Sequence, residues 1–378
     1  MCPYGLDAPG GVQGQVLGLA RALRGEGVDT LVVAPGRPGG VGSGGAPGVG
    51  SGGAPGTVLV GATIPVPANG SVAPLALAPA ALARTVWALR RFGPDIVHLH
   101  EPLAPGPTWA ALAAPLPGAH RVATLHRSGG DGLYRALGPV ARAALSRVDA
   151  VFAVSEQARS TASAALGRRP CPVVGNGVEL DRFSGAAPAP TEAPTILFVG
   201  RHEPRKGLAV LLQAVERAGE RWPGHLWIVG EGPQTDDLRR RYPPRPTRRW
   251  LGRVSDEELA GLLAGSQVLC APSLGGESFG VVLLEAMAAR SVVVCSDIPG
   301  YAAAAGGHAI LVAAGDADAL AAAIGSLAGS LVDGTGPASP AALAAAAAHA
   351  EGHSMTALAR RYLDIYAGLA GAPGSGDG

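Results

Sequence analysis

Short apolar runs with the composition of β-strands alternate with helical segments along most of the chain, in two series. The runs of the first series are 95–101, 121–126 and 150–155. Those of the second series are 195–200, 226–232, 250–253, 267–270, 292–295 and 310–312. Apolar strands that alternate with helices predict a parallel sheet covered by helices on both faces. A chain of 378 residues can bury two such cores. We therefore predict an α/β protein of two tandem Rossmann-like domains.

The domain boundaries are predicted from shifts in composition. An Ala- and Pro-rich stretch before the second series indicates a linker. Residues 36–56 repeat Val-Gly-Ser-Gly-Gly-Ala-Pro-Gly, which predicts a disordered insert because these residues have little apolar surface to bury. The predicted division is an N-terminal domain at 1–187, a linker at 188–194, a C-terminal domain at 195–352, a last helix at 353–370 and a disordered tail at 371–378.

The beginning of the sequence has the composition of a loop. A glycine-rich segment at 2–11 precedes a helix with apolar positions at Val12, Val16 and Leu19. In an α/β domain such a loop normally follows a strand, yet only Met1 stands before it. We therefore expect that a central first strand of the N-terminal domain is missing from this sequence.

Charge and cysteine usage exclude several classes of protein. The net charge of +1 argues against a protein that binds nucleic acid through bulk electrostatics. Four cysteines without C-x-x-C spacing indicate neither a zinc site nor a disulfide framework, so we expect small core residues in a reducing cytoplasm. No apolar run approaches the roughly 20 residues of a membrane-spanning helix.

Two carboxylates stand in unusual surroundings. Glu285 lies about a turn and a half inside a helix that is otherwise apolar, and Glu277 lies on the glycine-rich loop before that helix. A helix dipole acts only within the first turn and does not account for Glu285. An exposed position for Glu285 is the alternative, but its neighbours offer no polar face. We predict that both carboxylates accept hydrogen bonds from ligand hydroxyl groups, because a buried carboxylate needs donors.

Three cations crowd the loop at 200–207, which joins a strand to the helix at 208–218. Positive charge at a helix N-terminus is unfavourable unless an anion completes the site. We therefore predict a diphosphate site held by Arg201 and Lys206. The alternative is a solvated run of charges.

Other candidates carry less information alone. The pair Gly10-Gly11 opens a helix and lets backbone N–H groups approach a ligand, although such pairs are more often turns. His126 ends a strand at the edge where open α/β sheets bind ligands. We interpret His98 and His100 as structural, since no third metal ligand accompanies them. Asp316 and Asp318 precede an Ala-rich helix, so a helix cap is predicted there rather than a metal site.

Together these residues resemble the retaining glycosyltransferases of family 4, which have the GT-B fold. The motifs are Pro-Gly-Gly-Val at 9–12, Leu-His at 125–126, Gly-Arg-x-Glu-Pro-Arg-Lys-Gly at 200–207, Gly-Gly-Glu-Ser-Phe-Gly at 275–280 and Leu-Glu-Ala-Met-Ala at 284–288. Four further motifs resemble those of the family members that transfer mannose to phosphatidylinositol. These are Cys-Pro-Tyr at 2–4, Asn-Gly-Ser-Val-Ala at 69–73, His-x-His-Glu-Pro at 98–102 and Ala-Pro-x-Leu-Gly-Gly-Glu-Ser-Phe-Gly at 271–280.

The resemblance implies two Rossmann-like domains with a deep cleft for GDP-mannose and a last helix that crosses back to the first domain. It implies a catalytic set of His126, Arg201, Lys206 and Glu277. The implied donor-binding residues are Gly11 near the sugar, Arg201 and Lys206 at the diphosphate, Arg253 and Val254 at the base, Glu277, Ser278, Phe279 and Gly280 on the sugar loop, and Glu285 at the ribose. The implied acceptor-binding residues are Tyr4, Asp7, Gly10, Gln13, Asn69 and Ser71.

The resemblance further implies transfer of mannose to an inositol hydroxyl of phosphatidylinositol, in the cytoplasm and peripherally at the inner face of the membrane. No metal or other cofactor is expected, because Arg201 and Lys206 can neutralise the diphosphate. Two departures bear on the acceptor. Pro74 stands where the family has an arginine, and the helix at 79–92, which carries Arg84, Arg90 and Arg91, is less basic than the family's membrane-docking helix.

Several alternatives remain open at the level of sequence. A UDP- or GDP-sugar is possible as donor, since the base is expected to contact backbone groups. The acceptor could be a soluble inositol phosphate or another lipid or glycan alcohol. A nucleotide-sugar binding protein with impaired catalysis is the alternative of another class. The sequence does not predict the oligomeric state.

Overall fold

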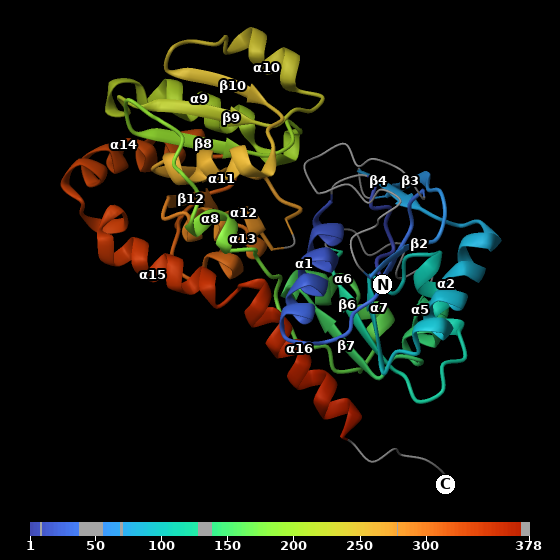
Figure 1. Cartoon of the computed structure of the whole chain (residues 1–378). Coiled ribbons are helices and arrows are strands. Elements are labelled where there is room, and N and C mark those ends of the chain that lie inside the picture. Colours follow the sequence, from blue (N-terminus) through green and yellow to red (C-terminus); the bar gives the residue numbers. More distant parts are fainter. Residues whose placement is uncertain (8–9, 38–55, 69–70, 128–137, 278, 372–378) are drawn as a thin grey trace. The chain divides into compact units, whose positions relative to one another are not determined.

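The computed structural model describes residues 1–7, 10–37, 56–68, 71–127, 138–277 and 279–371. The chain divides into two compact α/β units. Unit 1 comprises residues 1–177 and 355–378, and unit 2 comprises residues 178–354. Figure 1 shows the elements of each unit, coloured along the sequence. After residue 354 the chain returns to unit 1, so the C-terminal helix belongs to the first unit, as predicted.

Unit 2 contains a six-stranded sheet in which every pairing is parallel. Its strands are β8 (Thr195–Val199), β9 (His225–Val229), β10 (Arg248–Gly252), β11 (Val268–Ala271), β12 (Val292–Ser296) and β13 (Ile310–Val312). They are arranged in the order β10-β9-β8-β11-β12-β13. The chain winds outward in one direction from β8 and in the other direction from β11. The topological switch point, where sheets of this kind bind ligands, therefore lies between β8 and β11.

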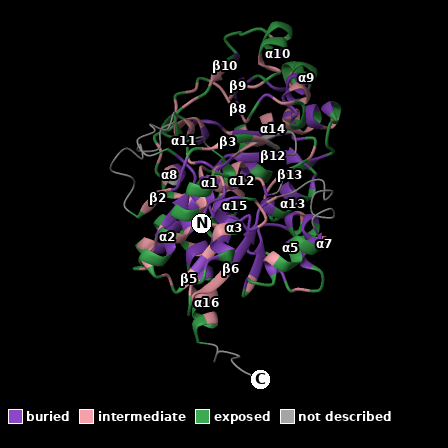
Figure 2. Cartoon of the chain, turned by 90° about the vertical axis from the view of Figure 1, so that its right-hand side faces the viewer, coloured by how far each residue is buried: buried purple, intermediate pink, exposed green. Residues whose placement is uncertain are grey.

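Helices cover both faces of this sheet. They are α8 (Asp181–Ser184), α9 (Leu208–Ala218), α10 (Thr235–Arg241), α11 (Asp256–Gly265), α12 (Val281–Ala288), α13 (Pro299–Ala305), α14 (Ala317–Asp333) and α15 (Pro340–Glu351), with 3-10 turns η1 (Pro204–Lys206), η2 (Gly219–Arg221) and η3 (Gly336–Ala338). Successive residues of β8 enter opposite cores: Leu197 packs with α11 to α13, whereas Ile196 and Phe198 pack with α9 and α14. Figure 2 shows the buried residues concentrated in the sheets. Burial on both faces explains the uninterrupted apolar runs.

Unit 1 contains shorter sheets. Its strands are β1 (Val32–Ala34), β2 (Thr57–Leu59), β3 (Ile64–Ala68), β4 (Ser71–Leu75), β5 (Ile96–His100), β6 (His120–Leu125) and β7 (Ala150–Ala153). Its helices are α1 (Gly11–Gly25), α2 (Pro79–Phe92), α3 (Pro107–Ala113), α5 (Gly138–Leu145), α6 (Glu156–Thr161), α7 (Ser163–Leu166) and α16 (Met355–Ala370). Parallel pairs join β1 to β2, β5 to β6, and β6 to β7. The antiparallel hairpin of β3 and β4 was not predicted from sequence.

Residues Met1 and Cys2 lie between the two parallel sheets of unit 1. The N-terminal amino group of Met1 donates to the carbonyl of His98 at 2.8 Å, and the backbone N–H of Cys2 donates to the carbonyl of Val33 at 3.0 Å. These two residues thus link β5 to β1. Among the described residues, no strand pairs with both β1 and β5.

The last helix, α16, is held to the sheet of unit 1 by buried hydroxyl and imidazole groups. His98 contacts the hydroxyl of Tyr366 through Nδ1 at 2.6 Å and that of Thr124 through Nε2 at 2.8 Å. The hydroxyls of Thr124 and Tyr362 are 2.8 Å apart. His98 is therefore structural, as predicted.

Several smaller predictions can be compared with the structure. The four cysteines are free and buried, and the Asp316 side chain caps α14 by accepting from the N–H of Asp318 at 3.0 Å and of Ala319 at 2.9 Å. Residues 188–194, predicted as the linker, lie within unit 2. The N–H of Ala189 donates to the carbonyl of Gly261 in α11 at 2.8 Å. Most of the predicted insert, at 38–55, and the tail at 372–378 lie outside the described residues.

Candidate functional site

The cation loop of unit 2, residues 200–207, follows β8 directly and lies at the topological switch point. It forms the turn η1 and ends at Gly207, whose φ of 71° is left-handed. A Cβ at Gly207 would overlap the carbonyl oxygen of Pro272, the residue after β11. The N–H of Leu274 also donates to the carbonyl of Arg205 at 2.7 Å. The loops after β8 and β11 are therefore packed together, and only glycine fits at their closest approach.

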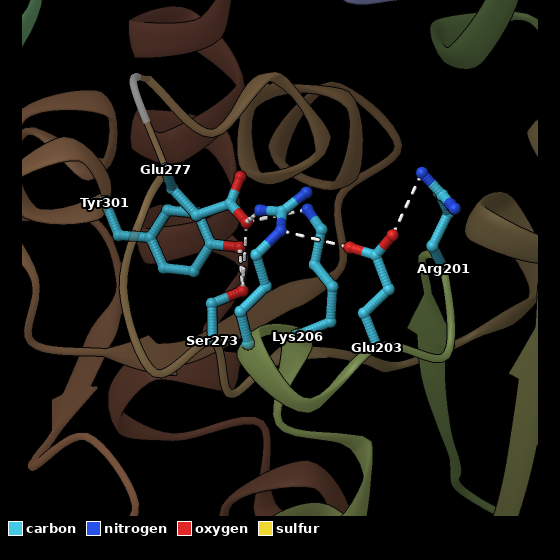
Figure 3. Close-up of polar contacts among 7 residues, drawn as sticks. Arg201, Glu203, Lys206, Ser273, Glu277 and Tyr301 are labelled. Atoms are coloured by element: carbon cyan, nitrogen blue, oxygen red, sulfur yellow. Dashed lines mark hydrogen bonds and ion pairs between the residues drawn. The ribbon is translucent and has the colours of Figure 1, made fainter. Parts of the chain in front are cut away.

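The carboxylate of Glu277 joins these two loops electrostatically. Its Oε1 lies 2.7 Å from Nζ of Lys206 and 3.0 Å from Nη1 of Arg205, and it accepts a hydrogen bond from Oγ of Ser273 at 3.3 Å. Figure 3 shows Lys206 and Ser273 converging on this carboxylate. The side chains of Glu277 and Lys206 are only 13% and 21% exposed, so this ion pair is less screened than a surface pair.

Glu203 organises the other cations of the loop. One of its oxygens lies 2.9 Å from Arg201 and the other lies 3.1 Å from Nε of Arg205. The side chain of Arg201 is 61% exposed, so an anion can approach it from solvent. Lys206 is the only lysine in the sequence. The structure thus brings Arg201, Lys206 and Glu277, three of the four predicted catalytic residues, into one network.

The structure adds three residues that the sequence analysis did not assign to the site. Arg205 and Ser273 contact Glu277 directly, and the hydroxyl of Tyr301 lies 2.8 Å from Oγ of Ser273. Burial raises the pKa of Tyr301 above its usual value, so its hydroxyl stays protonated. A Cβ at Gly280 would lie 2.6 Å from the Tyr301 ring, which therefore packs against the end of the sugar loop.

Glu285 lies on α12, as predicted, and its side chain is half-buried. Desolvation raises its pKa to about 7, while Arg182 on α8 opposes this and Asp256 and Glu179 reinforce it. Near neutral pH the carboxyl group of Glu285 is therefore poised between its two protonation states. A ligand that donates hydrogen bonds would favour the charged form.

The predicted donor-binding residues of unit 2 that remain lie on different loops. Arg253, directly after β10, is 83% exposed and lies 3.2 Å from a carboxylate oxygen of Glu231. Val254 packs against the hydrophobic core. Phe279 is buried, with its ring 5.8 Å from that of His353. Ser278 lies outside the described residues.

His126 follows β6 in unit 1 and is buried against neighbours from β5. Its Nε2 lies 2.9 Å from Nδ1 of His100. Burial lowers the pKa of His126 to about 3, so the imidazole is neutral at physiological pH. The backbone N–H of His126 donates to the carboxylate of Glu101, which also accepts from the N–H of Arg127 at 3.1 Å. His126 can therefore offer or accept a hydrogen bond, but it is a poor base.

Four of the residues predicted to bind the acceptor substrate, Tyr4, Asp7, Gly10 and Gln13, lie before or within α1. Gln13 is buried and donates to the carbonyl of Gly5 at 3.2 Å, and Gly10 lies against its side chain. Gly11, which was predicted near the donor sugar, begins α1, and a Cβ there would meet no atom within 4 Å. Tyr4 is half-buried and Asp7 is exposed. Of the two residues predicted on the hairpin, Asn69 lies outside the described residues and Ser71 begins β4.

Among the residues that the structure describes, no group of three or more His, Cys, Asp or Glu side chains is arranged to hold a metal ion. None of the helices in the described part of the chain is both long and apolar enough to cross a membrane.

Comparisons with known proteins bear on the family and the fold of the chain. Residues 9–182 match the profile described as Glycosyltransferase Family 4, and residues 193–330 match that described as Glycosyl transferases group 1. The chain is 38% identical over 336 residues to the phosphatidyl-myo-inositol mannosyltransferase of Mycolicibacterium smegmatis, covering 86% of this chain and 82% of that protein. It is 39% identical over 333 residues to the protein of the same name from Mycobacterium leprae, covering 85% and 84%.

Solved structures resemble the chain in fold. A glycosyltransferase from Rickettsia africae has a TM-score of 0.71 at 18% identity, covering 99% of this chain and all of that one. Sucrose-phosphate synthase from Thermosynechococcus elongatus has a TM-score of 0.66 at 21% identity, covering 96% and 94%. The two Rossmann-like units correspond to the GT-B fold of these neighbours. The chain is therefore a hexosyltransferase that belongs to glycosyltransferase family 4.

Proposed function

We propose that this enzyme transfers mannose from GDP-mannose to an inositol hydroxyl of phosphatidylinositol, with retention of configuration at the anomeric carbon. The observation that carries the donor half is the network of Arg201, Lys206 and Glu277 at the switch point between β8 and β11. It offers two cations to a diphosphate and one carboxylate to a sugar hydroxyl. The acceptor is inferred from relatives named phosphatidyl-myo-inositol mannosyltransferase, which match more than four fifths of the chain.

In the proposed reaction, the bond between the anomeric carbon and the diphosphate breaks while the acceptor oxygen bonds to the same face of that carbon. Arg201 and Lys206 stabilise the negative charge that develops on the leaving diphosphate. The proton of the acceptor hydroxyl passes to a leaving phosphate oxygen, so the poorly basic His126 is not needed as a base. Glu277 holds a hydroxyl of the transferred sugar, and the neutral imidazole of His126 offers a hydrogen bond to a ligand of unit 1.

We also propose that the reaction needs no metal ion. Two side-chain cations at one loop can neutralise the diphosphate, which is the task of a divalent ion in other nucleotide-sugar enzymes. Chelation of divalent ions with EDTA should therefore leave the rate of transfer unchanged. A rate that EDTA abolishes and Mg²⁺ or Mn²⁺ restores would contradict this part of the proposal.

A peripheral position on the cytoplasmic face of the membrane is supported by helix α2. Trp87 on this helix is 60% exposed. The guanidinium of Arg91 lies 5.7 Å from the centroid of its ring, and Arg84 and Arg90 add positive charge on the same helix. An exposed indole beside arginines suits the interface of an anionic membrane.

Glu285 gives this proposal a pH signature. If the ribose hydroxyls donate to Glu285, GDP-mannose binds the charged carboxylate and must displace a proton from a group whose pKa is about 7. The affinity should rise with pH below 7, by up to about tenfold per unit, and level off above it. Titration calorimetry between pH 5.5 and 8.5, in buffers of different ionisation enthalpy, measures both the affinity and the released proton.

The Glu285→Gln variant is the matched control, because it keeps the shape of the side chain and removes the titration. It should bind GDP-mannose more weakly at neutral pH and show little pH dependence. GDP-mannose is preferred to GDP as ligand, since the terminal phosphate of GDP itself titrates in this range. An unchanged pH profile in Glu285→Gln would contradict the ribose assignment.

A matrix of donors and acceptors tests the proposed function as a whole. GDP-mannose and UDP-glucose are each combined with phosphatidylinositol vesicles, with soluble inositol phosphate or with no acceptor, and products are identified by mass spectrometry. We expect mannosylated phosphatidylinositol from GDP-mannose and vesicles only. Product from soluble inositol phosphate without vesicles would mean that the acceptor is not the proposed phospholipid. Binding of GDP without any product would indicate a binding protein instead of an enzyme.

A further inference from the structure

Unit 1 contains an apolar pocket that the proposed catalytic groups leave unexplained. Its volume is about 440 Å³, within the roughly 300–1000 Å³ of small-molecule sites. Three parts of the unit form its walls: the hairpin of β3 and β4, the segment from the end of β5 through α3, and helix α5. The apolar lining includes Val66, Leu75, Leu103, Trp109, Leu112 and Ala144.

The polar lining of this pocket connects it to the predicted catalytic histidine. Tyr4, Glu101 and Arg127 all line it. The Glu101 carboxylate accepts from the backbone N–H groups of His126 and Arg127, and both Glu101 and Arg127 act electrostatically on the Tyr4 hydroxyl. One end of the pocket therefore lies directly beside the backbone of His126.

The rim of the pocket carries large apolar side chains. Trp109 is 39% exposed and Val140 is 53% exposed, and both line the pocket. Exposed apolar residues around an apolar opening favour contact with a lipid phase over water. Arg147 also lines the pocket, and among the described residues no ion pair of its side chain is found. A cation at such a rim complements a phosphate.

We propose that this pocket binds an acyl chain of the phospholipid acceptor and so draws the head group toward His126. The inference rests on the proposed function, because it takes phosphatidylinositol as the acceptor. A phospholipid with an inositol head group matches each part of this pocket. Its acyl chain fits the apolar walls, its phosphate fits the rim at Arg147, and its hydroxylated head fits the polar end at Tyr4, Glu101 and Arg127. A soluble inositol phosphate would leave the apolar walls unused.

Catalysis should then depend on the length of the acyl chain even when no membrane is present. For short-chain phosphatidylinositols below their critical micelle concentrations, kcat/KM should rise on the order of fourfold for each methylene that the pocket accepts. Ala144→Phe narrows the pocket and should flatten this dependence. The affinity for GDP-mannose, whose proposed binding residues lie mainly in unit 2, should stay unchanged in the same variant.

Ala143→Phe is a second variant for the same purpose, because Ala143 is exposed and lines the pocket, so a larger side chain there does not disturb the core. Ala322→Phe is the matched control. Ala322 is an exposed alanine on α14 of unit 2, away from the pocket lining. It should keep the chain-length dependence of the unchanged enzyme.

Trp109 provides a measurement that does not require turnover. Phosphatidylinositol with short brominated acyl chains should quench tryptophan fluorescence, and Trp109→Phe should remove most of that quenching whereas Trp87→Phe should not. The quenching should disappear in Ala144→Phe and persist in Ala322→Phe. Quenching without any mannosylated product would support the pocket and overturn the proposed acceptor reaction. Product formation with no quenching from Trp109, or with a chain-length dependence that survives both filling variants, would overturn the pocket alone.

Discussion

Replacing Lys206 by alanine should lower the turnover of mannose transfer by about a hundredfold or more, which is the effect expected when one preorganised donor to a developing oxyanion is removed. In the structure Nζ of Lys206 lies 2.7 Å from Glu277 and its side chain is 21% exposed. The same change leaves Glu277 with Arg205 and Ser273, so the loop keeps its fold. The measurement is kcat for product formation from GDP-mannose and phosphatidylinositol.

Two controls make this result specific. Arg217→Ala removes a cation on α9 that is paired with Asp318 at 3.0 Å on the surface of unit 2, and it should leave kcat within twofold, as expected for an exposed pair (roughly 0–1 kcal/mol). Lys206→Arg keeps the charge but spreads it over a planar group, and it should recover only part of the activity. A loss of less than fivefold in Lys206→Ala would remove Lys206 from the proposed mechanism.

The second large effect is expected at Gly207, where alanine should destabilise unit 2 by more than 3 kcal/mol, counting roughly 1–2 kcal/mol for the left-handed backbone and the rest for displacing a packed loop. Its φ is 71°, and a Cβ there would overlap the carbonyl oxygen of Pro272. Because a domain of this size loses about 2–4 °C of Tm per kcal/mol, the transition of unit 2 should fall by about 6 °C or more. Calorimetry with and without GDP measures the stability and the binding together.

Gly334 is the matched control for that substitution. It caps α14 with a φ of 61°, and a Cβ there would meet no atom within 4 Å. Gly334→Ala should therefore lower the free energy of unfolding only by the roughly 1–2 kcal/mol that a left-handed backbone costs a non-glycine residue. It should leave GDP binding intact. Equal losses of stability in the two variants would mean that the contact between the loops after β8 and β11 does not constrain Gly207.

The parallel sheet of unit 2 could be predicted because its strands are buried on both faces and therefore form continuous apolar runs. Arg201, Lys206 and Glu277 were chosen as site residues from their charge and from the loops on which they stand. Their meeting in one network depends on the pairing of β8 with β11, which are not consecutive in the sequence and whose pairing was not predicted.

Other features depend on packing that no local pattern records. Tyr301 contacts Ser273 from an alanine-rich helix without any periodic signal. The contact of His100 with His126 depends on the register in which β5 pairs with β6, where His100 lies opposite Thr124. The first unit ends at Gly177, whereas the N-terminal domain was predicted to end at residue 187. The prediction was too late because the Ala- and Pro-rich segment that follows has the composition of a linker. It packs against α11 instead.

The ion pair of Lys206 and Glu277 also bears on which molecules can compete for the site. An anion that attracts Lys206 away leaves the Glu277 carboxylate, which is only 13% exposed, with Arg205 and Ser273 alone. The loop keeps its fold, but a poorly exposed carboxylate with fewer partners is less stable. Inorganic phosphate or pyrophosphate brings negative charge and no compensation for Glu277. A sugar diphosphate brings hydroxyl donors in the same molecule. If Lys206 and Glu277 hold the diphosphate and a sugar hydroxyl as proposed, we expect the pair to favour a complete activated sugar over the abundant anions that share its charge.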